Sequence, residues 1–373
     1  MKYYLIAGEA SGDMHGANLI NGIKKQDVNA DFRFFGGDLM QKAGTSLTVH
    51  YKHMAFMGLW EVLMNLNSIA RFMKICRKDI IDFNPDVIIL IDYAGFNLKI
   101  AKFVHEKGYK VYYYISPKLW AWNKSRVKLF KKYVDKLYAI FPFEVDFYKQ
   151  NGYDKVEYLG HPLLDEIDKK KKGLTKGKEF IAKNNLPEKP IIALLSGSRK
   201  QEIERCLPEM IAITKNYPDY QFVIAGVRSL PEELYQQYLK DTSVNIVYDQ
   251  TYNLLHNATA AVVTSGTATL ETAILNIPEV VIYKTSPVTY FIGKPFVHIR
   301  FFSLVNLIMD KETVKELLQY NLAVDIRTEL DKILFDETYR GKMLEEYDIM
   351  RQRLGQPGAS DRVAKAIVES MLT

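Results

Sequence analysis

The sequence predicts an α/β protein with two doubly wound halves, each built on a parallel sheet covered by helices on both faces. Continuous apolar runs such as KYYLIAG, DVIILID and PIIALL alternate with amphipathic stretches, which is typical of strands buried on both sides. A chain of 373 residues is too long for one compact core. A lysine-rich stretch near residue 160 also separates two such alternating series.

The first series predicts a strand at 2–8 with a helix at 17–26 after it, and a second strand and helix within 31–44. An apolar strand then begins at 86 and ends in a polar loop by 95, a helix at 97–108 leaves it, and another strand is expected at 110–117. The stretch 160–180, GHPLLDEIDKKKKGLTKGKEF, is interpreted as an exposed linker or loop because its charges are grouped.

The second series predicts strands at 190–195, 221–227, 244–250, 260–264 and 279–285. Helices are expected after 199 and 266, and Gly355, Pro357 and Gly358 divide a helical tail in two. We therefore expect an N-terminal domain at 1–165 and a second at 166–344. The tail at 345–373 would pack back on the first domain or exchange with another subunit.

Composition limits the partners. The formal net charge of +6 suits an anionic partner such as a nucleotide or a phospholipid surface. We expect no nucleic acid, since no RNP or zinc-finger signature is present. The only cysteines are Cys76 and Cys206, which favours a reducing compartment. With no signal-peptide pattern and no run of ~18 apolar residues, a soluble or peripheral intracellular protein is expected.

Four polar stretches follow predicted strands, where doubly wound sheets bind ligands. The first, GEASGDMHGA, holds Glu9 and His15 but neither common phosphate motif. Taken alone, it is better explained as a tight strand-to-helix turn. The second, IDYAGFN, begins with Asp92. A carboxylate at a buried strand end is costly unless it faces a cleft or a partner, so Asp92 is a candidate general base. The alternative is a helix cap.

The other two stretches suit a diphosphate. In SGSRKQEI, Gly197 and Ser198 offer backbone N–H groups at a helix start, and Arg199 adds a cation. In TSGTATLE, small hydroxyl side chains precede a carboxylate that is expected in the first turn of the helix. That carboxylate can accept hydrogen bonds from both hydroxyls of a ribose. A capping box would need the same residues. This second set is Ser265, Gly266, Thr267, Thr269 and Glu271.

Metal and hydrolase chemistry find no support. His50 and His53 lie close in sequence, yet nothing nearby completes a ligand set. The chain also has no G-x-S-x-G elbow.

A broad apolar stretch runs from residue 54 to 78 and ends in a cluster of cations. This pattern suits shallow insertion into an anionic bilayer or an acyl-chain pocket, although a helix buried between domains is an equal alternative. The candidate contact residues are Phe56, Met57, Leu59, Trp60, Leu63 and Met64.

Taken together, the motifs resemble the lipid-A-disaccharide synthase family over nearly the whole chain. The resemblance rests on AGEASGDMHGA, FMGLWEVL, IDYAGFNLKIAK, YYISPKLWAWNKSRVK, FPFEVDFY, YLGHPLLD, LLSGSRKQEI, TSGTATLE and SLVNLI…ELLQ. Of these, SPKLWAWNKSRV is very specific.

The resemblance implies a GT-B glycosyltransferase with two Rossmann-like domains facing a cleft, acting without metal or cofactor. UDP-2,3-diacylglucosamine would donate its sugar, with inversion, to 2,3-diacylglucosamine 1-phosphate. The products would be the β-1,6-linked disaccharide 1-phosphate and UDP. The enzyme would be peripheral on the cytoplasmic face of the inner membrane of a Gram-negative bacterium. A homodimer is left open.

The resemblance also implies roles for residues. Asp92 would be the base, with Glu9 and His15 orienting the acceptor or assisting. Arg199 and the TSGTATLE residues would hold UDP, joined by Asn306 and Gln319. One departure is Gly95, which stands where the family commonly has a second Asp, so that carboxylate's role does not transfer.

Two other readings remain open. Another GT-B enzyme, such as a UDP-sugar 2-epimerase, would share the loops of the second half but would not explain the apolar stretch 54–78. A non-catalytic lipid-binding scaffold would explain that stretch but not Asp92, Arg199 and Glu271.

Overall fold

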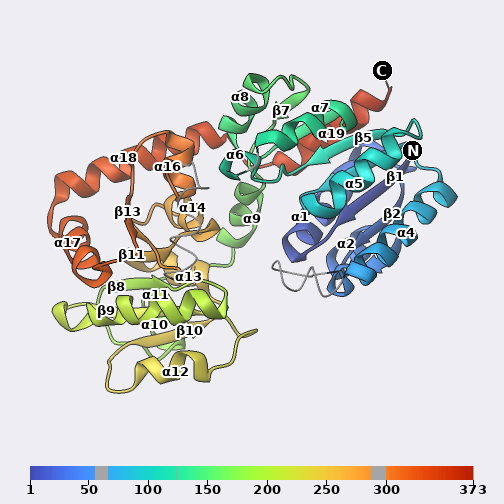
Figure 1. Cartoon of the computed structure of the whole chain (residues 1–373). Coiled ribbons are helices and arrows are strands. Elements are labelled where there is room, and N and C mark those ends of the chain that lie inside the picture. The colour runs from blue at the N-terminus through green and yellow to red at the C-terminus, as the bar shows by residue number, and fades with distance from the viewer. Residues whose placement is uncertain (55–65, 123, 287–299, 373) are drawn as a thin grey trace. The chain divides into compact units, whose positions relative to one another are not determined.

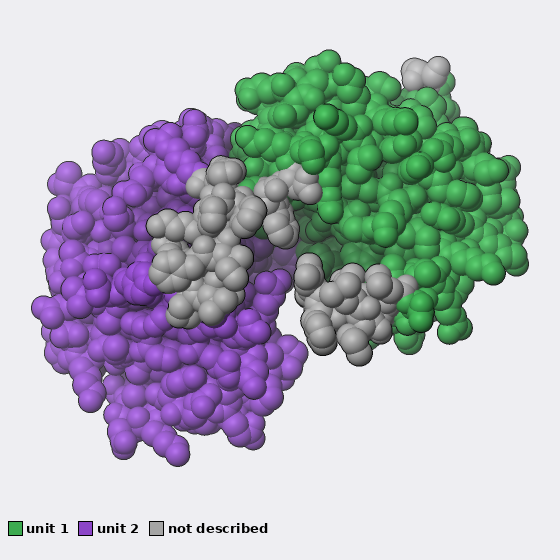
Figure 2. All heavy atoms as spheres, in the orientation of Figure 1, with its two compact units in different colours: residues 1–165, 356–373 green, residues 166–355 purple. Residues whose placement is uncertain are grey.

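The computed structural model describes residues 1–54, 66–122, 124–286 and 300–372. The chain forms two compact units, residues 1–165 with 356–373 and residues 166–355 (Figures 1 and 2). Each unit is a parallel sheet with helices against it, which confirms the predicted fold class.

Unit 1, residues 1–165 and 356–373, holds a seven-stranded sheet in the order β3-β2-β1-β4-β5-β6-β7. The order turns back between β1 and β4, where a doubly wound sheet has its ligand crevice. The strands are β1 (Lys2–Ala7), β2 (Asp31–Gly36), β3 (Ser46–His50), β4 (Val87–Ile91), β5 (Lys110–Tyr114), β6 (Lys136–Ala139) and β7 (Val156–Tyr158).

Helices cover both faces of this sheet. Tyr3 and Leu5 of β1 pack with α1 and α19 on one face, while Tyr4 and Ile6 pack with α4, α5 and α7 on the other. Such two-sided burial is the physical reason why these strands read as continuous apolar runs. The helices are α1 (Ala10–Gln26), α2 (Asp38–Ala43), α4 (Leu66–Phe83), α5 (Ala94–His105), α6 (Leu119–Trp122), α7 (Val127–Tyr133), α8 (Pro142–Gln150) and α19 (Ala359–Leu372).

Unit 2, residues 166–355, holds a six-stranded sheet in the order β10-β9-β8-β11-β12-β13. Its strands are β8 (Ile191–Leu195), β9 (Gln221–Gly226), β10 (Asn245–Tyr248), β11 (Ala258–Thr264), β12 (Glu279–Tyr283) and β13 (Lys315–Leu318). Its helices are α10 (Gly177–Lys183), α11 (Lys200–Ala212), α12 (Glu233–Leu239), α13 (Thr251–His256), α14 (Thr267–Ile274), α16 (Leu304–Met309), α17 (Leu322–Phe335) and α18 (Glu337–Leu354).

The lysine-rich stretch 160–180 was expected as an exposed linker or loop. It does contain the boundary between the two units, at 165/166, but it is largely helical, so the expected loop was wrong. Helix α9 occupies Pro162–Lys171. A proline suits the first turn of a helix, and Glu166 pairs with Lys170 one turn on, at 2.9 Å. Grouped lysines are compatible with a helix because their side chains extend into solvent.

The tail returns to unit 1 through two polar residues. The Asp165 carboxylate accepts the backbone N–H groups of Gly358, Ala359 and Ser360 at 2.5–3.1 Å. Arg362 donates to the carbonyl of Leu159 at 2.7 Å. Helix α19 is thereby held where it packs on α1. Among the described helices, none combines the length and apolar character needed to cross a bilayer.

Candidate active site

The carboxyl ends of β1 and β4 bring Glu9 and Asp92 together. The two strands are paired, with Ala7 opposite Ile91, so the residues that follow them share one sheet edge. The Asp92 N–H donates to the carbonyl of Tyr114 at 3.2 Å. Its own carbonyl accepts from Asn97 Nδ2 at 2.8 Å and from the Tyr113 hydroxyl. With both backbone groups tied, the point from which the Asp92 side chain leaves the backbone is fixed.

The backbone at this edge is strained. Asp92 and Tyr93 have φ of +43° and +47°, in the left-handed region that costs a residue with a side chain about 1–3 kcal/mol. The pair turns the chain sharply from β4 into α5. Strain of this kind is concentrated at functional sites.

The electrostatic setting favours a base that works near neutral pH. Burial, reinforced by the Glu9 carboxylate beside it, raises the pKa of Asp92 to about 6. The Tyr93 backbone N–H and the Lys118 ammonium act the other way on the same pKa. A carboxyl tuned in this way accepts a proton at pH 7 more readily than an ordinary aspartate.

Gly8 makes room for Tyr93. A Cβ atom on Gly8 would lie 2.3 Å from the Tyr93 ring, so the ring is packed directly on the glycine. The Tyr93 hydroxyl donates to the carbonyl of Met54 at 2.8 Å. The first glycine of the opening motif therefore shapes the floor beside Asp92.

The opening motif is less of a loop than expected, because α1 begins at Ala10 and includes Ser11 to Gly16. Asp13 is nearly fully buried. Its carboxylate accepts the N–H groups of Gly37, Leu39 and Met40 at 2.7–3.0 Å. This carboxylate at the start of α2 stabilises a six-residue helix, which gives Asp13 a structural role.

His15, half-buried on α1, lies near His161. Burial, with a smaller effect of His15, lowers the pKa of His161 to about 3, so that His161 stays neutral. His161 Nδ1 accepts the N–H of Leu163 at 3.1 Å, which places the ring proton on Nε2. The second histidine was not anticipated from the sequence.

In unit 2, the SGSR turn follows β8 and lies next to the end of β11, since Leu195 pairs with Val263. Gly197 has φ of +102°, and a Cβ there would lie 2.5 Å from Glu202. The Glu202 carboxylate accepts the N–H groups of Ser198 and Arg199 at 3.0 and 3.2 Å. The donors expected to meet phosphate are thus held by an internal anion.

Arg199 itself is open to solvent. Its side chain is 73% exposed and lies 3.6 Å from Glu202. Its guanidinium is available to an anion without disturbing the core.

After β11, Gly266 and Thr267 are exposed, while Ser265 donates to the carbonyl of Phe302 and Thr269 to that of Gly266. Glu271 lies in the second turn of α14, not the first as expected. It accepts from the Tyr252 hydroxyl at 2.7 Å, and burial raises its pKa. Tyr252 therefore orients the predicted ribose-binding carboxylate.

The side-chain amides of Asn306 and Gln319 are hydrogen-bonded to other residues of unit 2. The Asn306 amide makes four hydrogen bonds of 2.7–2.9 Å, to Thr313, Val314 and Glu316. Its two N–H groups and the two lone pairs of its carbonyl oxygen are then all used. The Gln319 amide bonds both backbone groups of Thr285. In this structure both side chains therefore hold loops, and their expected contact with UDP stays a prediction.

The candidate membrane contacts Phe56, Met57, Leu59, Trp60, Leu63 and Met64 lie outside the described residues. Among the residues that are described, no three His, Cys, Asp or Glu side chains come together as a metal site.

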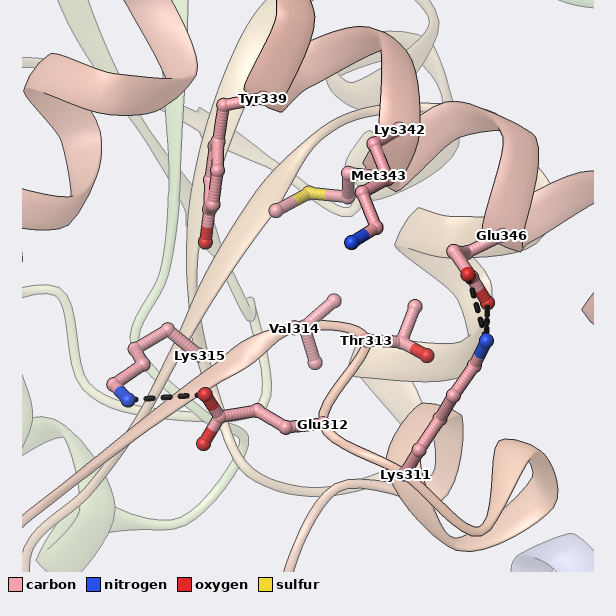
Figure 3. A pocket seen from close by; sticks show the side chains of 9 residues that line it. All are labelled: Lys311, Glu312, Thr313, Val314, Lys315, Tyr339, Lys342, Met343 and Glu346. Carbon is pink, nitrogen blue, oxygen red and sulfur yellow. Dashed lines mark hydrogen bonds and ion pairs between the residues drawn. The ribbon is translucent and has the colours of Figure 1, made fainter.

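A cavity of about 210 Å³ lies at the amino end of β13, with the Lys342 ammonium pointing into it (Figure 3). Lys311 and Lys315 at its rim pair with Glu346 and Glu312. It contains none of the predicted site residues, and ligands in such sheets bind at the carboxyl ends.

Besides His161, sequence reasoning missed three side chains around these sites, namely Lys118, Glu202 and Tyr252. Glu202 was visible as the acid three residues after Arg199, the spacing of a capping box. Tyr252 is far in sequence from Glu271, so only the fold brings them together.

Comparisons with known proteins agree with this architecture. A family model described as lipid-A-disaccharide synthetase matches residues 3–367. The lipid-A-disaccharide synthase of Geobacter sulfurreducens is 35% identical over 379 residues, covering 99% of this chain and 97% of that protein. The enzyme of the same name from Syntrophus aciditrophicus is 37% identical over 369 residues, covering 96% and 95%.

Among solved structures, a UDP-GlcNAc 2-epimerase from Neisseria meningitidis, bound to UDP-GlcNAc, matches with a TM-score of 0.67. The match covers 99% of this chain and all of that one, at 16% identity. At that identity the likeness concerns the fold alone.

Proposed function

This chain belongs to the lipid-A-disaccharide synthase family, and from that premise we propose that it joins UDP-2,3-diacylglucosamine to 2,3-diacylglucosamine 1-phosphate. It is a glycosyltransferase of lipid A biosynthesis with the GT-B fold. The proposal adds the two substrates, inversion at the donor sugar, and UDP and the lipid A disaccharide 1-phosphate as products.

The proposed step is a single displacement. The acceptor's 6-hydroxyl gives its proton to the Asp92 carboxylate while its oxygen bonds to C1 of the donor sugar. The bond from C1 to the β-phosphate oxygen breaks, and its electron pair leaves with UDP. Inversion requires the attacking oxygen on the face opposite the departing UDP. Glu9 keeps the pKa of Asp92 high, and His15 is proposed to orient the acceptor.

The observation that carries the proposal is Asp92, fixed at the end of β4 with its pKa raised to about 6. A general base is most effective when its pKa lies near the working pH. Structural aspartates that cap helices have their pKa lowered by the N–H groups that they accept, so the alternative role as a simple cap is disfavoured.

UDP is proposed to bind on unit 2. Arg199 would offset the diphosphate charge together with the N–H groups of Ser198 and the Gly266–Thr267 turn. Glu271, oriented by Tyr252, would accept the ribose hydroxyls. Glu202 must turn away before the Ser198 N–H can reach a phosphate oxygen, so its carboxylate serves as an internal substitute for the anion. Gly197, Ser265 and Thr269 support these turns, and Asn306 and Gln319 hold the loops beyond them.

The test is a turnover assay with the purified chain and both acylated sugars. We expect UDP release matched by a β-1,6-linked disaccharide 1-phosphate, identified by mass and by the anomeric coupling constant. A parallel reaction with UDP-GlcNAc alone, followed by NMR, tests the epimerase alternative. Appearance of the 2-epimer without disaccharide formation would overturn the proposal.

The apolar stretch 54–78 is proposed to dock on the cytoplasmic face of the inner membrane, where both acylated substrates would reside. Combined replacement of Met57, Leu63 and Met64 by Ser is expected to reduce sedimentation with anionic vesicles several-fold. Replacement of Val324, Ile349 and Leu372, which are exposed elsewhere, is the matched control. Equal sedimentation of the first variant and the wild type would contradict membrane docking by this stretch.

A further inference from the structure

One lysine at the carboxyl edge of unit 1 is presented in an unusual way. From Val111 to Leu119 every residue is buried except Lys118. Among the described residues, Lys118 forms neither an ion pair nor a side-chain hydrogen bond. A cation without a structural partner, standing in an otherwise buried segment, needs another explanation than packing.

The segment that carries Lys118 is held at several points. Ile115, with φ of +64°, donates its N–H to the carbonyl of Tyr138 at 3.2 Å. A β-branched residue in this region is strained, so the turn is imposed by its surroundings. Ser116 and Tyr148 share a hydrogen bond of 2.6 Å. Lys118 therefore leaves a rigid turn.

The other side of Lys118 is equally fixed. Leu119 is buried, and the Trp120 indole donates to the Glu144 carboxyl at 3.3 Å. Glu144 is fully buried and also accepts the N–H groups of Ile140 and Phe141, at 3.2 and 3.1 Å. These contacts anchor α6 on the start of α8, so Lys118 has little freedom beyond its own side chain.

The turn places Lys118 next to the candidate base. Strand β5 pairs with β4, with Tyr114 opposite Ile91, and the Tyr114 carbonyl accepts the N–H of Asp92. Residues that follow the two strands are thus neighbours on one edge. In agreement with this, the Lys118 ammonium lowers the pKa of both Asp92 and Glu144.

The chemistry of the proposed acceptor calls for a cation here. A phosphomonoester carries about −1.5 to −2 charges at pH 7, and the Asp92 and Glu9 carboxylates would repel it. In a hexose 1-phosphate, the 6-hydroxyl and the phosphate flank the ring oxygen and so project from the same edge of the sugar. Asp92 directly follows β4, and Lys118 lies four residues after the end of the adjacent β5, so the two side chains come from one sheet edge and can engage these two groups of one sugar.

We propose that Lys118 binds the phosphate of the acceptor, so that the acceptor's 6-hydroxyl is presented to Asp92. This inference rests on the proposed function for the identity of the acceptor. It makes Lys118 the residue that distinguishes a sugar 1-phosphate from the same sugar without phosphate.

The experiment compares two acceptors, 2,3-diacylglucosamine 1-phosphate and its dephosphorylated counterpart, with wild type, Lys118→Ala and Lys118→Arg. Lys118→Ala is expected to raise KM for the phosphorylated acceptor on the order of tenfold to a hundredfold, as for a charged hydrogen bond. At pH 8, above the pKa of Asp92, the loss of this variant with the dephosphorylated acceptor is expected to be much smaller, because that acceptor offers Lys118 no phosphate. Lys118→Arg is expected to recover most of the loss, because the charge is retained.

Lys110→Ala is the matched control. Lys110 is the first residue of the same strand, exposed at the opposite end of β5, so the variant loses the same charge away from the site. We expect its kinetics with both acceptors to equal those of the wild type.

A second readout follows the pH profile of kcat/KM with the dephosphorylated acceptor. The charged and titratable groups facing Asp92 are Glu9, Tyr93, Tyr113 and Lys118. Removing Lys118 is expected to move the acid limb of the profile to higher pH. A purely structural role would change neither this limb nor the acceptor selectivity.

If Lys118→Ala loses kcat/KM equally with both acceptors, or with neither, the inference is overturned. Transfer by the wild type in the same assay would still uphold the proposed function. A wild type that transfers to neither acceptor would instead contradict the proposed function. Calorimetric binding of soluble glucosamine 1-phosphate, weakened by Lys118→Ala but not by Lys110→Ala, would then still support a phosphate site. Unchanged binding would overturn it.

Discussion

The carboxyl edges of the two sheets are built differently. In unit 1, Asp92 is half-buried, and burial together with the Glu9 carboxylate raises its pKa to about 6. In unit 2, Arg199 is 73% exposed, so it keeps its charge without desolvation. Burial makes a carboxylate a better proton acceptor, because its pKa moves toward the working pH. Burial of a cation that binds an anion instead costs desolvation free energy.

The two edges also differ in how the backbone turns. Unit 1 uses left-handed Asp92, Tyr93 and Ile115, all with side chains that oppose this geometry. At its phosphate turn unit 2 uses Gly197, which adopts the same region without strain. Strained turns that are held by packing fix the backbone under a side chain. The glycine turn instead directs the N–H groups of Ser198 and Arg199 to one acceptor, which in this structure is the Glu202 carboxylate. The difference fits the proposed division between chemistry in unit 1 and binding in unit 2.

The largest expected effect tests the chemical half of this comparison. Asp92→Asn is expected to lower kcat by about 10²–10⁴, the range for a general base, because the amide accepts no proton. The affinity for UDP, measured by calorimetry, is expected to stay at the wild-type value. Loss of UDP binding together with activity would remove Asp92 from the base role.

The binding half is tested by Arg199→Ala. We expect UDP affinity to fall by about 1.5–3 kcal/mol, as for a charged hydrogen bond. Arg327→Ala serves as the control, since Arg327 is also exposed in unit 2 but lies on α17. If both variants bind UDP as tightly as the wild type, the phosphates bind elsewhere.

The cost of burying Asp92 predicts a gain in stability when it is removed. Because its folded pKa lies above its unfolded value of 3.8, the stability that its protonated form provides is present below that value and is lost as pH rises through 6. Asp92→Asn is therefore expected to be more stable than the wild type at pH 8, by roughly 1–3 kcal/mol. Urea denaturation at pH 8 and pH 4 measures this. An equal difference at both pH values would argue against the raised pKa.

The smallest expected effect sharpens the role of Glu9. Activity requires ionised Asp92, so kcat/KM is expected to rise with pH through about 6 and then level off. Glu9→Gln removes the neighbouring negative charge, which lowers the pKa of Asp92 and moves the acid limb to lower pH. Ser11→Ala, which removes only the 3.2 Å hydrogen bond to Glu9, is the control. A limb that stays in place in Glu9→Gln would exclude coupling between the two carboxyls.

Much of this could be read from the chain. The strands are continuous apolar runs because both sheet faces are buried, and the polar turns after them mark where a ligand is expected. The errors have local causes. The lysine-rich helix α9 was read as a linker because charge was given more weight than the proline at its start. Asn306 was assigned to UDP from resemblance, and no local pattern in the sequence indicates that its amide also bonds to its own loop; that assignment stays a prediction.

By itself the sequence determined the fold class, the family and the order of the polar turns, since these depend on apolar patterning and motif order along the chain. The tertiary structure alone decided which side chains share a sheet edge. Asp92, Glu9 and Lys118 come from turns after three different strands, and Glu271 meets Tyr252 from another helix. Distances across a sheet follow from strand order and register, and no local pattern in a single sequence encodes either.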